Sequence, residues 1–112
     1  MPSNRKAKGE MLLGTLDMLI LQTLLPGPNH AHSIAHSIER GSDDILQVEH
    51  GSLYPALYRL EDRGWIAGRE GRSEEGRPIR VYRLTAAGRR QLAEELEVWR
   101  LFSVAIDRVV TG

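Results

Sequence analysis

The sequence of 112 residues contains no cysteine, and this absence excludes disulfide bonds, thiolate zinc sites and thiol nucleophiles. It also lacks an excess of either charge, because 15 Lys and Arg residues balance 15 Asp and Glu residues and the formal net charge is +0. The overall composition therefore gives no indication of nucleic-acid binding, and any basic surface has to be found locally.

A long hydrophobic run is missing as well. The most apolar segment spans residues 12–25, but it contains Asp17 and Gln22 and falls short of the roughly 20 apolar residues that a membrane-spanning helix needs. No small-residue cleavage site follows it before Pro26, so we do not expect a signal peptide. We expect a soluble, cytoplasmic protein with one modest core.

Residues 51–66, GSLYPALYRLEDRGWI, have the clearest helical pattern in the chain. On a helix of about 3.6 residues per turn, the apolar residues form one narrow stripe: Leu53, Ala56, Leu57 and Leu60. The opposite face is polar and consists of Ser52, Tyr54, Pro55, Tyr58, Arg59 and Asp62. Its hydroxyls and guanidinium can bond to phosphates or base edges, which predicts a helix that enters a DNA groove. An ordinary amphipathic helix with a solvated face is the alternative.

The ends of this helix can be predicted from two residues. If the helix begins at about Ser52, Pro55 lies in the first turn, where the backbone amides have no partner within the helix. Gly64 then provides the left-handed residue that ends it.

Two helices are expected before this one. Residues 11–25 are apolar nearly all round, so in a small domain this first helix should contact a second subunit, with Leu12 and Leu16 in the contact. The second helix should start after an Asn29 or His30 cap and end at about Arg40, with a short connector at 42–50. A short connection between two such helices is the helix-turn-helix pattern.

His32 and His36 have the i, i+4 spacing with which two imidazoles can share a metal ion, and Glu39 follows them. A metal-sensing regulator is therefore an alternative. However, the sequence specifies no third ligand and no HExxH base, so solvent-facing histidines are the preferred interpretation and no metal site is predicted.

A hairpin is expected after Gly64. Residues 65–70 and 79–84 are strand-like, and the turn sequence GRSEEGRP joins them. Residues 69–83 contain five arginines and three acids, so their net charge is 5 − 3 = +2. We expect this hairpin to reach the DNA backbone or minor groove with Arg72, Arg77 and Arg80. A solvated hairpin whose charges protect an edge strand is the alternative.

The last helix should be capped by Thr85 and run over residues 86–110, which gives a length of about 37 Å. Apolar residues recur along it at alternating spacings of four and three, a seam suited to a partner helix. We therefore expect a homodimer. The predicted seam includes Leu92, Leu96, Trp99, Phe102 and Ile106.

Three segments resemble the small subfamily of PadR-type transcriptional regulators. GSLYPALYRLEDRGWI resembles the family motif G-[ST]-[LI]-Y-x-x-L-x-R-L-E-x-x-G-[LW]-I, and YRLTAAGRRQL at 82–92 is similar to its closing motif. LGTLDMLILQTLLPGPNH at 13–30 follows the family's first helix and turn. One departure is visible, because His30, Ala31 and His32 stand where the family commonly has His-Gly-Tyr.

The resemblance implies a mainly α, winged helix-turn-helix fold with a two-stranded wing and a long C-terminal dimerisation helix. The expected division is a flexible basic arm (1–10), a DNA-binding domain (11–85) and the dimerisation helix (86–112). It also implies a homodimeric repressor on double-stranded DNA, released by a small hydrophobic or phenolic effector or by another signal. The residues that would contact DNA are Ser52, Tyr54, Pro55, Tyr58 and Arg59.

Trp99 is placed like the tryptophans that line an effector pocket in some drug-sensing relatives, although a tryptophan on a dimer seam can also be plain core. We find no arrangement of catalytic residues and expect neither an enzyme nor a cofactor. A dimeric module that binds another protein instead of DNA is the remaining alternative.

Overall fold

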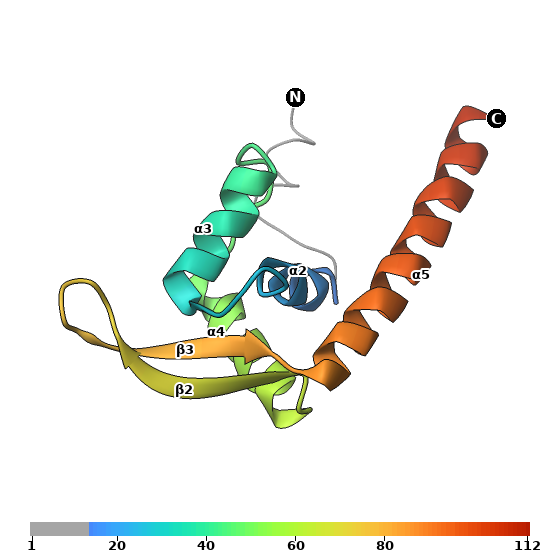
Figure 1. Ribbon diagram of the computed structural model, residues 1–112. Coiled ribbons are helices and arrows are strands. Elements are labelled where there is room, and N and C mark those ends of the chain that lie inside the picture. Colours follow the sequence, from blue (N-terminus) through green and yellow to red (C-terminus); the bar gives the residue numbers. More distant parts are fainter. Residues whose placement is uncertain (1–13) are drawn as a thin grey trace.

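The computed structural model describes residues 14–112 (Figure 1). Its elements in chain order are α2 (Thr15–Thr23), β1 (Asn29–His30), α3 (Ala31–Gly41), α4 (His50–Asp62), β2 (Ile66–Arg72), β3 (Pro78–Leu84) and α5 (Ala86–Thr111). This order confirms the predicted winged helix with a long C-terminal helix. The predicted arm, residues 1–10, and the predicted dimer residue Leu12 lie outside the described residues.

The sheet has one strand more than the predicted wing. Its order is β1-β3-β2 with antiparallel pairing, and β1 adds only two residues, Asn29 opposite Tyr82 and His30 opposite Val81. The predicted two-stranded wing is formed by β2 and β3. The third strand, β1, was not predicted, because so short a strand carries no detectable alternation in the sequence. The β2–β3 pairing continues to Arg72 opposite Pro78, so the loop at the wing tip is shorter than predicted.

The core lies where α2, α3 and α4 meet the sheet (Figure 1). The apolar stripe of α4 is its centre, because Leu53, Ala56, Leu57 and Leu60 are all at most 1% exposed, as the periodicity predicted. Each fully buried leucine contributes about 1.5–3 kcal/mol relative to an exposed one, so this stripe determines which side of α4 faces inward.

Helix α4 begins earlier than predicted, at His50, with Glu49 as its N-cap residue. Pro55 therefore lies inside the helix, so its predicted position in the first turn was wrong. Because proline has no N–H, the carbonyl of Gly51 loses its usual helical donor, and Gly51 lies at an exposed position where water can replace that donor.

The end of α4 is as predicted. Gly64 has φ 77°, its N–H donates to the Glu61 carbonyl at 3.0 Å, and the N–H of Trp65 donates to the Leu60 carbonyl at 3.0 Å. These two bonds form a Schellman motif, in which a left-handed residue satisfies the last carbonyls of the helix.

Local side chains organise the connection from α3 to α4. The His30 ring caps α3 by accepting a hydrogen bond from the Ser33 N–H, and the Glu39 carboxylate accepts one from the Val48 N–H at 2.9 Å. Asp43 and Asp44 adopt left-handed conformations, with φ of 52° and 63°, in agreement with their predicted turn role. Glu39 is thus committed to a structural hydrogen bond.

Helix α5 starts at the predicted cap. The Thr85 hydroxyl accepts from the Gly88 N–H at 3.0 Å and donates to the Gly64 carbonyl at 2.6 Å, which ties α5 to the end of α4. The helix then projects away from the domain (Figure 1). No helix within residues 14–112 has the length and apolar character needed to cross a membrane.

Leu92 corrects the predicted dimer seam. It is only 3% exposed and belongs to the core of its own chain, so it cannot be a dimer contact. Leu16 and Leu96 are half-buried and pack against the same core. The helical period placed Leu92 on the seam, but the first turns of α5 lie on the domain, and only the later turns leave it.

Helix α5 closely approaches the backbone of Trp65, the residue before β2, at Gly88. A Cβ at Gly88 would lie 2.0 Å from the Trp65 carbonyl oxygen and 2.8 Å from Leu84 Cδ1. Because one of these atoms is backbone, Gly88→Ala should destabilise the fold by about 1–3 kcal/mol or more, measured by urea unfolding at fixed protein concentration.

Gly41→Ala is the matched control, because nothing lies within 4 Å of its added Cβ at the end of α3. We expect Gly41→Ala to leave the stability unchanged or slightly higher. Equal unfolding midpoints for the two variants would contradict the close approach of Gly88 to Trp65.

Candidate nucleic-acid interface

The outer face of α4 presents two tyrosines to solvent. Tyr54 and Tyr58 are 53% and 74% exposed, and Ser52 and Pro55 beside them are also exposed. The Tyr54 ring packs edge-on against the ring of His50, with centroids 5.9 Å apart. His50, in the first turn of α4, was not among the predicted site residues, because the helix was expected to start after it.

Arg59 lies on the same helix but has an intramolecular partner. Its Nη2 donates to Asp17 Oδ1 of α2 at 2.8 Å. Asp17 is the one buried charged residue within residues 14–112, whereas the Arg59 side chain is 45% exposed. Arg59, predicted to contact DNA, is therefore also part of the packing of α4 against α2.

Arg80 is held in a similar way on the other side of α4. Its Nη2 lies 2.6 Å from Glu61 Oε2, and the same oxygen accepts a hydrogen bond from the Gly68 N–H at 3.2 Å. The hydrogen bond from Arg80 to Glu61 and the negative charge of Glu61 raise the pKa of the Arg80 guanidinium. Glu61 therefore fastens both strands of the wing to α4.

Gly68 makes room for this contact. A Cβ at Gly68 would lie 2.6 Å from Arg80 Nε, so the absence of a side chain lets the guanidinium pass over β2 to Glu61. The wing thereby takes a defined position relative to α4.

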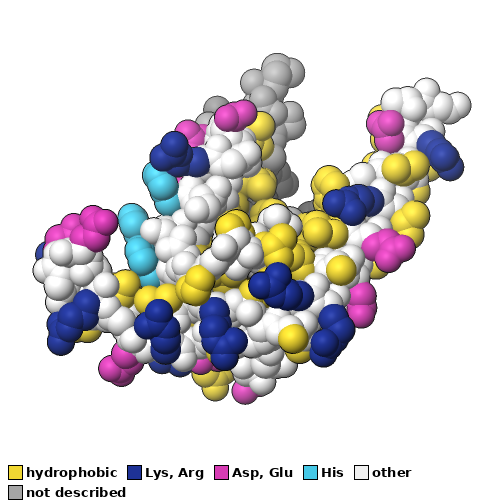
Figure 2. Space-filling view, viewed as in Figure 1, with side chains coloured by type: hydrophobic (Ala, Val, Ile, Leu, Met, Phe, Trp, Pro, Cys, Tyr) yellow, Lys and Arg dark blue, Asp and Glu magenta, His cyan; other side chains and the backbone are white. Residues whose placement is uncertain are grey.

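The other two predicted wing arginines lie at its tip. Arg72 Nη1 donates to the Gly76 carbonyl at 2.8 Å, and the Arg77 N–H donates to Ser73 Oγ at 3.1 Å. Arg72 and Arg77 are both exposed. Figure 2 shows basic side chains spaced along the wing and the adjoining lower edge of the domain, away from the apolar side chains of α5.

A recess of about 300 Å³ lies between the start of α3, α4 and β3. His30, His32, Tyr54, Arg80 and Tyr82 are among the residues that line it. Burial raises the pKa of the Tyr82 phenol. The recess brings His32, which stands at the departure from the family motif, next to the outer face of α4.

The structure adds nothing to a metal site at His32 and His36. Both are exposed on α3, and Glu39 is bonded to the backbone of Val48. Within residues 14–112, no three His, Asp or Glu side chains lie close enough together to hold a metal ion.

Helix α5 exposes a long apolar surface (Figure 2). Trp99, Phe102, Ile106 and Val110 are 52%, 65%, 59% and 75% exposed. The other exposed large apolar residues of α5 are Val98, Leu101, Val104 and Val109. Solvent-exposed apolar patches of this kind mark interaction sites in soluble proteins.

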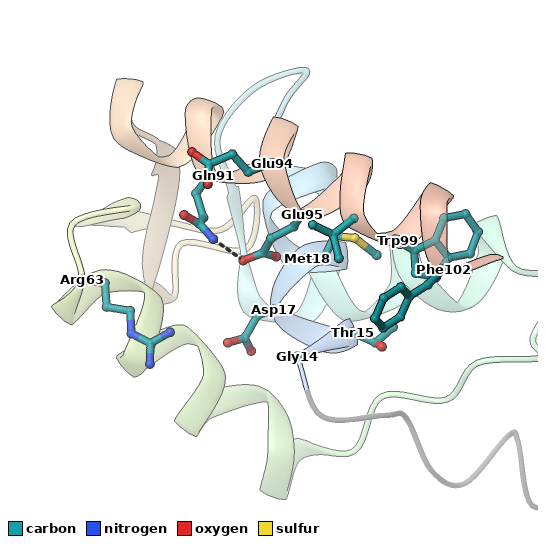
Figure 3. Close-up of a pocket in the computed structure, with 11 residues that line it drawn as sticks. Gly14, Thr15, Asp17, Met18, Arg63, Gln91, Glu94, Glu95, Trp99 and Phe102 are labelled. Carbon is teal, nitrogen blue, oxygen red and sulfur yellow. Dashed lines mark hydrogen bonds between the residues drawn. The ribbon is translucent and has the colours of Figure 1, made fainter. Parts of the chain in front are cut away.

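A groove of about 510 Å³ separates α5 from α2 (Figure 3). Met18 of α2 and Val98, Trp99 and Phe102 of α5 form its apolar wall. Its polar lining consists of Thr15, Asp17, Arg63, Gln91, Glu94 and Glu95, with Gly14 at the edge. Trp99 therefore lines this groove and also lies on the exposed surface of α5.

Glu95 is the least satisfied group in this groove. Its Oε2 accepts a hydrogen bond from Gln91 Nε2 at 2.7 Å (Figure 3), whereas Oε1 is buried and has no partner within residues 14–112. Buried carboxylate oxygens are normally hydrogen-bonded, so this atom is an exception among the described residues.

Comparison with known sequences gives a match to one family. A model described as the transcriptional regulator PadR-like family matches residues 20–94. An uncharacterized protein X of Lysinibacillus sphaericus is 26% identical over 105 residues, covering 94% of this chain and 96% of that protein. Transcriptional regulator Rv3488 of Mycobacterium tuberculosis is 49% identical over 49 residues, covering 44% of this chain and 45% of that protein.

Solved structures match over most of the chain. A transcriptional regulator from Clostridium thermocellum has a TM-score of 0.80 at 28% identity, covering 88% of this chain and 92% of its own. A PadR family transcriptional regulator from Eggerthella lenta has a TM-score of 0.74 at 28% identity, with coverages of 88% and 84%. A PadR-like transcriptional regulator from Bacillus cereus has a TM-score of 0.77 at 25% identity, with coverages of 91% and 97%.

Proposed function

We propose a mechanism from the premise that this chain belongs to the PadR-like family of transcriptional regulators and is not an enzyme. In this mechanism the protein is a sequence-specific DNA-binding repressor that acts as a homodimer on an inverted repeat. The observation that carries the proposal is the outer face of α4, where Tyr54 and Tyr58 are exposed directly opposite a fully buried stripe. A small-molecule effector, or another signal, releases the protein from DNA.

In this mechanism α4 enters the major groove and the wing contacts the flanking backbone. Ser52, Tyr54, Pro55 and Tyr58 lie on the entering face, and Arg59 lies at its edge. Arg72 and Arg77 extend the contact from the wing tip, while Arg80 contributes the exposed part of its guanidinium. Phosphate contacts supply much of the affinity, so binding weakens as salt is raised.

The dimer is formed through the later turns of α5. Its exposed apolar surface, from Val98 to Val110, is too large for a stable monomer and is covered by a second copy. Trp99, Phe102 and Ile106 are the proposed contacts, and Leu16 and Leu96 adjoin them where α2 meets α5. A dimer with twofold symmetry requires an operator with matching twofold symmetry, whose half-sites are about 10 bp apart or a multiple of that distance. Occupation of that site excludes the transcription machinery.

The groove between α2 and α5 is the proposed effector site. Its wall combines the Trp99 and Phe102 rings with a polar rim, which suits a small hydrophobic or phenolic molecule. Because the groove borders the proposed dimer contact, a bound molecule can alter how the two copies pack and thereby the spacing of their α4 helices.

DNA binding is tested by selecting duplexes from a random pool at fixed salt and then measuring the affinity of Tyr58→Ala. We expect an enriched inverted repeat, and a loss of about 1–3 kcal/mol for the variant, because Tyr58 is the more exposed of the two tyrosines on α4. Arg108→Ala, near the end of α5, is the control and should bind normally. Selection of no sequence, or an unchanged affinity of Tyr58→Ala, would refute the proposed use of α4.

The dimer is tested with two variants of α5, each of which introduces one aspartate on a different side of the helix. Phe102→Asp introduces a charge into the proposed contact, so we expect a monomer in analytical ultracentrifugation at concentrations where the unmodified chain is a dimer. Ala93→Asp introduces the same charge into the stripe shared by Arg100 and Asp107 and should remain dimeric. A monomeric unmodified chain would contradict the proposal directly.

The effector site is tested through Trp99 fluorescence. The chain has two tryptophans, so Trp65→Phe leaves Trp99 as a single reporter beside the groove. With 4-ethylphenol as the probe, we expect saturable quenching and release of the selected duplex over the same concentration range. Quenching without release would show that the groove binds the probe but does not control DNA binding.

A further inference from the structure

We propose that Asp17 is a positioning residue for DNA recognition, because it holds the Arg59 guanidinium in the orientation in which that group meets a backbone phosphate of the operator. This inference rests on the proposed function and adds to it a residue of α2 that lies outside the recognition helix and the wing. The ion pair between the two side chains, 2.8 Å long and spanning 42 positions of sequence, is the observation that leads to it.

The two partners differ in their surroundings. Asp17 is 8% exposed and lies on α2 next to residues of the core, so its carboxylate has a fixed place. The Arg59 side chain is 45% exposed, so one side of the guanidinium meets Asp17 while another faces solvent. Figure 3 shows the Asp17 side chain pointing from α2 toward α4, the helix whose C-cap residue is the labelled Arg63.

The chemistry of the guanidinium makes this arrangement useful. Arginine presents five N–H donors in a rigid planar fork, so a hydrogen bond to Nη2 restricts the direction of the other donors. Arg59 follows Pro55 by four residues and Ser52 by seven, which places all three along one line of α4. A phosphate that meets this line therefore finds an arginine that is already ordered.

A purely electrostatic role for Asp17 predicts the opposite effect of mutation. If Asp17 only reduced the positive charge near DNA, its neutralisation would strengthen binding to every duplex. If it positions Arg59, its neutralisation weakens binding to the operator, where base contacts hold α4 in one register and Arg59 therefore meets one defined phosphate. On random DNA no single register is held, so a fixed arginine orientation brings no advantage there, and binding stays unchanged or becomes slightly stronger. The sign of the change thus separates the two roles.

The experiment measures the affinities of Asp17→Asn for the selected operator and for random duplex at the same salt concentration. We expect about tenfold weaker operator binding, with no loss on random duplex, because the isosteric amide keeps the shape but not the charge that holds the arginine. Asp62→Asn is the matched control, since Asp62 is an exposed acid at the end of the same helix. It should bind the operator at least as well as the unmodified chain.

A double-mutant cycle identifies the route of the effect. In an Arg59→Ala background, Asp17→Asn should weaken operator binding no further, because the group that Asp17 positions is already gone. Arg59→Lys provides a second measurement if Asp17→Asn unfolds. It keeps the positive charge facing Asp17 but lacks the planar fork, so it should lose operator preference while retaining its affinity for random duplex.

Operator binding by Asp17→Asn that equals or exceeds that of the unmodified chain would overturn the inference. So would an undiminished effect of Asp17→Asn in the Arg59→Ala background. An unmodified chain that selects no operator would instead overturn the proposed function, and this inference with it.

Discussion

The arrangement of this protein depends on the burial of one side of α4. Its four apolar residues, Leu53, Ala56, Leu57 and Leu60, are essentially inaccessible to water, and they anchor the helix among α2, α3 and the sheet. Rotating the helix would expose that stripe at a cost of several kcal/mol. The polar side must therefore face outward. Burial of the apolar stripe fixes the rotation of α4 about its axis, so Tyr54 and Tyr58 remain exposed to solvent.

Ion pairs orient the long side chains at the edges of α4, which apolar burial does not place. Burial decides which side of α4 is outside, but it does not place the long side chains at the edges of that side. Asp17 holds Arg59 on the flank that faces α2, and Glu61 holds Arg80 and the Gly68 amide on the flank that faces the wing. Surface ion pairs contribute little to stability, so their value here lies in orientation. Asp17 is the exception, because a buried carboxylate without its partner would be costly.

Helix α5 divides into two parts with different tasks. Its first turns are fastened by the Thr85 cap, the close approach at Gly88 and the buried Leu92. Its later turns leave the domain and expose Trp99, Phe102 and their neighbours. The groove toward α2 opens where the two parts meet, and Asp17 belongs both to the wall of this groove and to the ion pair with α4. The Asp17 side chain thus connects the proposed effector site to the proposed recognition helix, because it lines the groove and pairs with Arg59 of α4.

The sequence by itself determined the features that depend on neighbouring residues: the buried stripe of α4, the Thr85 cap, the left-handed Gly64 and the exposure of Tyr54 and Tyr58. Helical periodicity and capping act over a few residues, so they can be recognised without a fold. Only the tertiary structure decided the strand β1, the partners of Arg59 and Arg80, and the burial of Leu92. These features depend on contacts between residues that are far apart in the chain. A local sequence pattern does not indicate which distant residues will come together in the fold.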